Sequence, residues 1–162
     1  TTHESAIRII SKEGELNNPA DRDHCIQYMT AIGLLKGDLV AEDYEDDVAK
    51  DPRVDSLRNK MFVEENKNYS KDYLDPNKRS IANELQIIFK DGSSTEKVEV
   101  EYPIGHRRRR EEGIPVLIKK FEENLKTQFS SERVEKIMKV CEDQNDLEIL
   151  NVTDFMEILI KE

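Results

Sequence analysis

Two residues four positions apart form the best local pair for acid–base chemistry. His24 and Tyr28 stand in the segment HCIQYM. If this segment is helical, residues four apart share one face, so an imidazole and a phenol would be neighbours. Such a pair can exchange protons or hold a carboxylate. The alternative is that both rings only pack the helix against a sheet, and the spacing leaves both interpretations open.

A run of four arginines follows the last histidine, in the stretch YPIGHRRRREEGIP at 102–115. Guanidinium groups bind carboxylates through two parallel hydrogen bonds, so His106, Arg107 and Arg108 are candidates for holding a carboxylate-rich ligand. Four successive residues cannot all point the same way, so one or two of Arg107–Arg110 would face the ligand. A solvated turn is the simpler interpretation. Nucleic-acid binding is disfavoured because two glutamates follow at once and no aromatic residues are interleaved.

The composition narrows the class of protein. The chain has 162 residues, 25 lysines and arginines, 35 aspartates and glutamates, and a formal net charge of −10. An acidic chain argues against general nucleic-acid binding. Its length and its 36% of hydrophobic residues suffice for a domain with a core. No apolar run approaches the roughly 18 residues of a membrane span. We expect a soluble, cytoplasmic protein without a membrane or nucleic-acid partner.

Other chemistries find little support. The sequence contains no phosphate-binding loop, dinucleotide fingerprint, HExxH or GxSxG motif. The three histidines lack metal-ligand spacing, and the cysteines, Cys25 and Cys141, are far apart. We therefore expect neither a metal site nor a disulfide. The acidic run at 41–51 lacks the spacing and the glycine of a calcium loop and is best read as a solvated helix face.

In the first half of the chain, short elements are predicted. Residues 1–12 are expected to be the end of a strand that contains three isoleucines. Asn18 can cap a helix from about Pro19 to Leu35 that stops at Gly37. Two short helices should follow, divided at Asp51–Pro52 because proline starts a helix but does not continue one.

The second half gives the clearest strand signal. After a short strand at 61–65 and a long polar loop, residues 81–102 should form a hairpin around Asp91–Gly92, with Val98, Val100 and Tyr102 on a buried face. A helix should open at Pro115, followed by two more helical segments. The order predicts an α+β fold, an antiparallel sheet with helices packed on one side. We expect one domain over 1–162, with 130–162 as a helical extension.

Several long segments together resemble the MmgE/PrpD family, which includes 2-methylcitrate dehydratases and cis-aconitate decarboxylase. They are LNNPADRDHCIQYM, LVAEDYEDDVAKDPRVDSLR, YLDPNKRSIAN and VEYPIGHRRRREEGIP. The resemblance runs from Thr2 to about Phe129, and more loosely to the end. It implies the smaller α+β domain of a two-domain enzyme, so the chain, which does not begin with methionine, is expected to be a fragment. The partner would be a large helical domain preceding it, in a homodimeric parent.

The resemblance also implies an activity. A hydro-lyase of this family converts 2-methylcitrate to 2-methyl-cis-aconitate and water in the 2-methylcitrate cycle of propionate catabolism, and citrate dehydration is expected as well. No iron–sulfur cluster or other cofactor is implied. Tyr28 matches a tyrosine that lines the active site in the decarboxylase branch, and His24 matches the histidine four positions before it. His106 matches a recurrent Gly-His pair.

The resemblance also bears on the isolated chain. Most acid–base groups would come from the helical domain, so the chain alone should be inactive. The alternative is a non-catalytic ligand-binding or regulatory module that reuses the fold.

Overall fold

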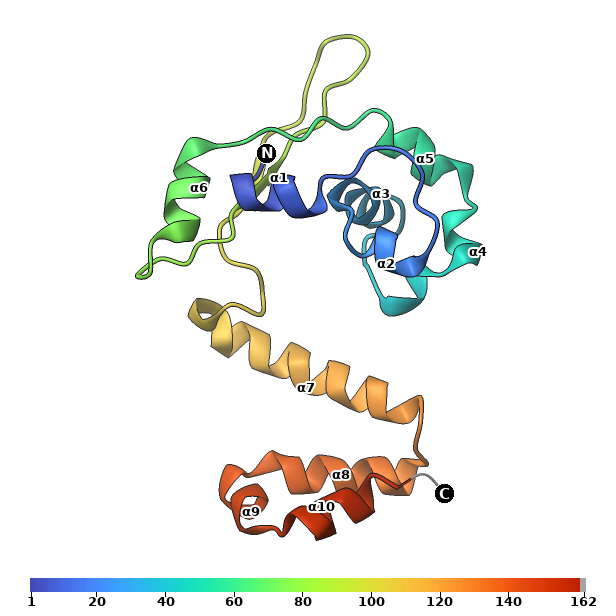
Figure 1. Ribbon diagram of the computed structural model, residues 1–162, viewed down its shortest axis with the longest axis vertical. Helices are drawn as coiled ribbons and strands as arrows, with labels where there is room; N and C mark the ends of the chain where they lie inside the picture. The colour runs from blue at the N-terminus through green and yellow to red at the C-terminus, as the bar shows by residue number, and fades with distance from the viewer. Residues whose placement is uncertain (161–162) are drawn as a thin grey trace. The chain divides into compact units, whose positions relative to one another are not determined.

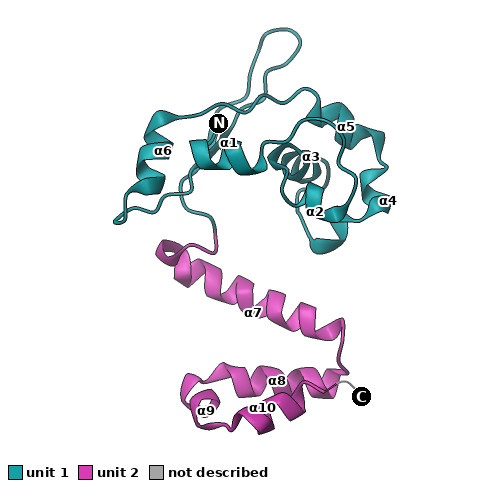
Figure 2. Ribbon diagram, viewed as in Figure 1, with its two compact units in different colours: residues 1–103 teal, residues 104–162 magenta. Residues whose placement is uncertain are grey.

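The structure is a computed structural model that describes residues 1–160 (Figure 1). It divides into two compact units, Thr1–Pro103 and Ile104–Glu162 (Figure 2). Each unit has its own cluster of buried apolar side chains. The boundary between the units, after Pro103, falls well before the helical extension expected at 130–162. The prediction that residues 1–162 form a single domain stays a prediction.

The first unit begins with a helix where the sequence predicted a strand. Helix α1 spans Glu4–Ile10. The strand prediction for 1–12 was wrong because His3 caps this helix: its Nδ1 accepts the backbone N–H of Ala6 at 3.2 Å. An acidic residue in the first turn and Arg8 in the last also suit the helix dipole. Thr2 forms an isolated parallel bridge to Glu65.

The helix predicted from Pro19 to Leu35 is two helices. Helix α2 spans Pro19–Arg22 and α3 spans Ile26–Lys36, with three non-helical residues between them. The cap was predicted correctly, since Asn18 Oδ1 accepts the N–H of Asp21 at 3.0 Å. The end is also confirmed: Gly37 has a φ of 80°, a left-handed conformation that glycine adopts at little cost.

Short helices continue the unit as predicted as far as residue 58. They are the 3-10 turn η1 (Ala41–Tyr44), α4 (Asp46–Ala49) and α5 (Pro52–Arg58). The division at Asp51–Pro52 is confirmed, with the Asp51 side chain capping α5.

The segment after residue 60 differs from the prediction. The strand predicted at 61–65 reduces to the bridge at Glu65. The predicted polar loop contains α6 (Lys67–Leu74), which is capped by Asn66.

The predicted hairpin is confirmed, and with it the α+β class. Strand β1 (Asn83–Leu85) pairs antiparallel with β2 (Val98–Val100), placing Leu85 opposite Val98. The turn contains Gly92 with a φ of 85°. The hairpin is the yellow-green projection at the top of Figure 1.

The hairpin packs on its charged face, contrary to the prediction. Thr1 Oγ1 donates to Glu84 Oε1 at 3.3 Å. Tyr69 of α6 hydrogen-bonds Glu99, and burial together with that carboxylate raises the pKa of Tyr69 to about 12. The apolar face, with Leu85, Val98 and Val100, is exposed, and Val98 is 64% exposed. Alternation predicted which residues share a face but could not say which face the helices cover.

The core of the first unit lies between α3 and α5. Tyr28, Ala31 and Ile32 of α3 are buried against Val54 of α5. Cys25, just before α3, is buried with them. This packing fixes the elements that surround the candidate site.

The second unit is helical. Up to residue 160, the 3-10 turn η2 (Arg107–Arg109) is followed by four helices: α7 (Arg110–Lys126), α8 (Ser131–Glu142), α9 (Gln144–Ile149) and α10 (Val152–Ile158).

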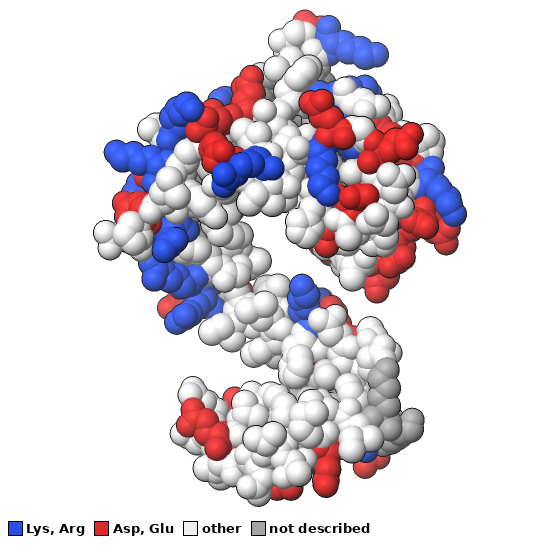
Figure 3. Space-filling model, in the orientation of Figure 1, with Lys and Arg blue, Asp and Glu red and all other residues white. Residues whose placement is uncertain are grey.

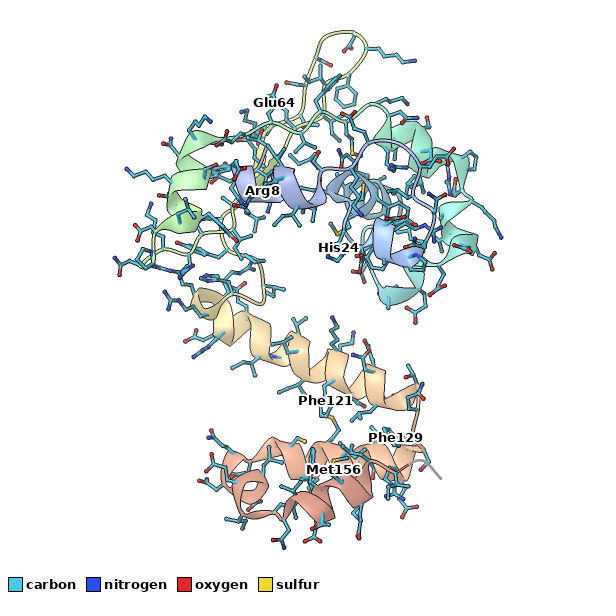
Figure 4. The ribbon with its side chains drawn as sticks, in the orientation of Figure 1. Arg8, His24, Glu64, Phe121, Phe129 and Met156 are labelled. Atoms are coloured by element: carbon cyan, nitrogen blue, oxygen red, sulfur yellow. The ribbon has the colours of Figure 1, made fainter. Side chains whose placement is uncertain are left out.

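The core of this unit is formed by side chains of α7, α8 and α10 and of the link between α7 and α8. Leu125, Val134, Ile137 and Ile158 are buried, and Phe129, labelled in Figure 4, packs against them.

Helix α7 begins five residues before the predicted start at Pro115. His106 Nδ1 accepts the N–H of Arg108 at 3.1 Å and so starts the turn that leads into the helix. Gly113 allows close packing, because a Cβ there would lie 2.4 Å from the carbonyl oxygen of Ile104. Pro115 therefore lies inside the helix, where it leaves the carbonyl of Glu111 without an intrahelical donor.

Candidate functional site

The structure does not place His24 and Tyr28 on one helix face. His24 lies in the turn between α2 and α3, with an exposed side chain whose Nδ1 is 2.5 Å from Asp23 Oδ1 (Figure 4). Tyr28 lies inside α3. The helical spacing that linked them fails because the helix breaks at Asp23–Cys25. The site roles of His24 and Tyr28 stay predictions, and each residue must now be considered by itself.

Tyr28 is a buried, hydrogen-bonded phenol. It is 2% exposed, and its hydroxyl donates to the carbonyl of Asp43 at 2.6 Å. Burial raises the pKa of Tyr28, while the Arg22 guanidinium opposes that rise. The phenol thus stays protonated at neutral pH. It is suited to donate a hydrogen bond or a proton and poorly suited to act as a base.

The buried Asp43 carboxylate fixes the turn whose carbonyl holds Tyr28. Its Oδ2 accepts the N–H of Val40 at 2.9 Å, and its Oδ1 pairs with Lys36. Burial alone would raise the pKa of Asp43, but the hydrogen bonds from Lys36 and Val40 outweigh it, so this pKa is lowered. Asp43 is therefore ionised at neutral pH and holds η1 in place.

A cavity of about 440 Å³ opens beside Tyr28. Its walls are the loop before α2 and parts of α2, α3, α4 and α5. Arg22, Asp55 and Arg58 line it together with Tyr28. A polar cavity that contains two cations and a phenol can accept a small anionic ligand.

The two arginines of this cavity are almost entirely buried. Arg22 is 5% exposed and donates through Nη1 to the carbonyl of Tyr44 and through Nη2 to Asp46. The Arg58 side chain is 9% exposed and donates to Asp55 and to the carbonyl of Gly14. Within residues 1–160, the Nε of each arginine is buried without a hydrogen-bond partner.

Sequence reasoning missed both arginines. Charged residues are rarely buried, and nothing local distinguishes Arg22 or Arg58 from exposed arginines such as Arg53. Both do lie in segments that carry the family resemblance, which is the one signal that could have found them.

The arginine run belongs to the second unit. Arg107 and Arg108 are exposed, and Arg109 pairs with Glu112 at 2.7 Å. The run passes from η2 into α7, and which of the four arginines faces a ligand stays a prediction. His106 acts locally as the cap of η2. Substrate contacts by His106, Arg107 and Arg108 stay predictions.

Figure 3 shows one face of the molecule. On the face drawn in Figure 3, charged side chains cover much of the first unit, whereas much of the second is uncharged. On α7 of that second unit, Ile114, Leu117 and Ile118 are each about half exposed.

Residues 1–160 show neither a cluster of metal ligands nor a membrane-spanning helix. There, no group of three or more histidine, cysteine, aspartate or glutamate side chains is placed to hold a metal ion. No helix in the described part of the chain is long and apolar enough to cross a membrane.

Comparison with known proteins identifies the class of domain. The model of the MmgE/PrpD C-terminal domain matches residues 1–144. The chain belongs to this family, which confirms the resemblance seen in its motifs.

Relatives of high identity share one name. A 2-methylcitrate dehydratase of Escherichia coli K12 is 52% identical over 159 residues, which cover 98% of this chain and 33% of that protein. The enzyme of the same name from Cupriavidus necator is 50% identical, over 97% of this chain and 32% of its own length. The mitochondrial one from Yarrowia lipolytica is 48% identical, over 99% of this chain and 30% of its own length. The chain thus spans about a third of the relatives that it matches.

Proposed function

We propose that the chain is the C-terminal domain of a 2-methylcitrate dehydratase. This hydro-lyase would convert 2-methylcitrate to 2-methyl-cis-aconitate and water in the 2-methylcitrate cycle of propionate catabolism, and would also dehydrate citrate. The observation that carries the proposal is about 50% identity, over nearly the whole chain, to bacterial and yeast proteins of that name. The parent is proposed to be a cytoplasmic homodimer.

The proposed chemistry removes a proton next to a carboxylate and expels a hydroxyl. Cations must offset the carboxylates, and an acid must protonate the leaving oxygen. Tyr28, a protonated phenol beside a cavity, suits the acid. Exposed His24 is proposed as a second proton-transfer group. His106, Arg107 and Arg108 are proposed to hold carboxylates at the start of α7, where the helix dipole also favours anions.

A chimera tests the activity directly. We expect residues 1–162 to restore 2-methylcitrate dehydration when they replace the matching third of the Escherichia coli relative, because the two segments are 52% identical. The isolated chain should show no turnover, since the helical domain would supply most acid–base groups. Formation of 2-methyl-cis-aconitate is followed by its absorbance. A folded chimera that binds substrate without turnover would favour the non-catalytic module instead.

A helical domain that precedes this chain in the parent is the proposed partner. The support is the exposed apolar face of the hairpin, with Leu85, Val98 and Val100. Exposed apolar patches of this kind typically mark interaction surfaces.

A charge placed on that face tests the contact. Val98→Glu should leave the isolated chain's stability within about 0.5 kcal/mol, because the side chain is already 64% exposed. In the chimera the same change should lower both the melting temperature and turnover. Ile88→Glu, at an exposed position outside the Leu85–Val98 face, is the matched control. An unaffected Val98→Glu chimera would show that this face is not the interface.

A further inference from the structure

We propose that the cavity bordered by α2, α3 and α5 is a carboxylate-binding site, in which Arg22 and Arg58 hold the anion beside Tyr28. The ligand class is a small polycarboxylate. The identity of its natural ligand, 2-methylcitrate, rests on the proposed function. Carboxylate binding itself can be measured on the chain without turnover.

The first support is the state of the two guanidinium groups. Arg22 and Arg58 are buried in the cavity wall, and within residues 1–160 their Nε atoms have no hydrogen-bond partner. A buried N–H of a charged group that lacks an acceptor is costly. A carboxylate that bonds Nε and a terminal nitrogen side by side satisfies the guanidinium in the geometry it prefers.

The second support is the nature of the present partners. The carboxylates paired with Arg22 and Arg58 are those of Asp46 and Asp55, which are 69% and 63% exposed. Because both carboxylates are largely exposed, neither aspartate is held beside its arginine by burial. A ligand carboxylate can therefore replace them when the guanidinium turns its Nε toward the cavity, and the displaced aspartates return to water.

The third support is the fit of the cavity to the ligand class. A volume of about 440 Å³ lies within the usual range for small-molecule clefts, roughly 300–1,000 Å³. Asparagine side chains at positions 17 and 59 add neutral hydrogen-bonding groups to the wall. Glu15 and Asp55 also line it, so its charge is nearly balanced in the absence of a ligand. Removing one of these acids should strengthen anion binding.

Opposite effects of two neighbouring substitutions provide the test. Citrate, titrated into the 162-residue chain by calorimetry, is the probe, and its trimethyl ester is the uncharged control. Arg58→Gln should weaken citrate binding by at least about tenfold, because a charge-assisted bidentate contact is lost. Asp55→Asn should strengthen it by roughly three- to tenfold, because a competing carboxylate is removed. Arg53→Gln, an exposed arginine on the same helix, should change nothing.

Folding is controlled separately from binding. Circular dichroism and the melting temperature of each variant exclude loss of structure, and Arg22→Lys, which keeps the charge but loses the fork, is the second variant at the site. If citrate does not bind the folded chain, or if Arg58→Gln and Asp55→Asn do not shift its affinity in opposite directions, the proposal is overturned.

Its failure is distinguishable from failure of the proposed function. An active chimera whose KM is insensitive to Arg58→Gln overturns the site and leaves the dehydratase assignment standing. An inactive chimera, with the binding results as expected, overturns the assignment and leaves the site.

Discussion

Replacing Tyr28 by phenylalanine is expected to lower the kcat for 2-methylcitrate dehydration by the chimera at least about a hundredfold, the usual lower range for a lost acid–base group. The phenol borders the cavity, and burial keeps it protonated. Its proton is donated to the carbonyl of Asp43, so transfer to substrate requires that this hydrogen bond be exchanged. The expected loss is therefore mainly in kcat, with a smaller change in KM.

Stability must be separated from catalysis in that experiment. Tyr28→Phe leaves the Asp43 carbonyl without its donor, which should cost about 1–3 kcal/mol but leave the domain folded. Tyr44→Phe is the matched control, because the Tyr44 ring stacks on Tyr28 with centroids 6.2 Å apart but does not line the cavity. Unchanged turnover in Tyr28→Phe, or an equal loss in Tyr44→Phe, would make Tyr28 a packing residue.

The features that were predicted correctly depend on a few adjacent residues. Asn18 caps α2, Gly37 ends α3, Asp51–Pro52 divides two helices, and Asp91–Gly92 turns the hairpin. Each is decided by the conformational preference of one or two residues, which the sequence states directly. The α+β class follows from the same local signals.

The features that were missed depend on tertiary contacts. The wrong face of the hairpin was assigned to the core because alternation does not reveal which side the helices cover. Helix α7 begins inside the arginine run, at Arg110, and not at Pro115. His106 caps the preceding turn, and Gly113 lets the helix pack closely against the backbone of Ile104. The cavity's arginines, Arg22 and Arg58, are distinguished by burial alone, and burial is set by packing that no local pattern records.

The second large effect is expected at Asp43, which links stability to the candidate site. Asp43→Ala should destabilise the chain by roughly 2–4 kcal/mol at neutral pH, because it removes a buried carboxylate that caps η1 and pairs with Lys36. Chemical denaturation of the 162-residue chain measures the loss. Asp38→Ala, at an exposed neighbouring acid, is the control and should stay within about 0.5 kcal/mol.

The pH dependence of that loss gives the sharper test. The native pKa of Asp43 is lowered from 3.8, so its carboxylate stabilises the fold above that pH, and the contribution disappears as pH falls through the native pKa. Wild type and Asp43→Ala should therefore differ most near neutrality and converge in acid. Because the same turn presents the carbonyl that holds Tyr28, the variant should also loosen that phenol, seen as a fall in its raised pKa. A stability difference that persists unchanged below pH 3.8 would mean that packing, and not the ionised carboxylate, holds this turn against Tyr28.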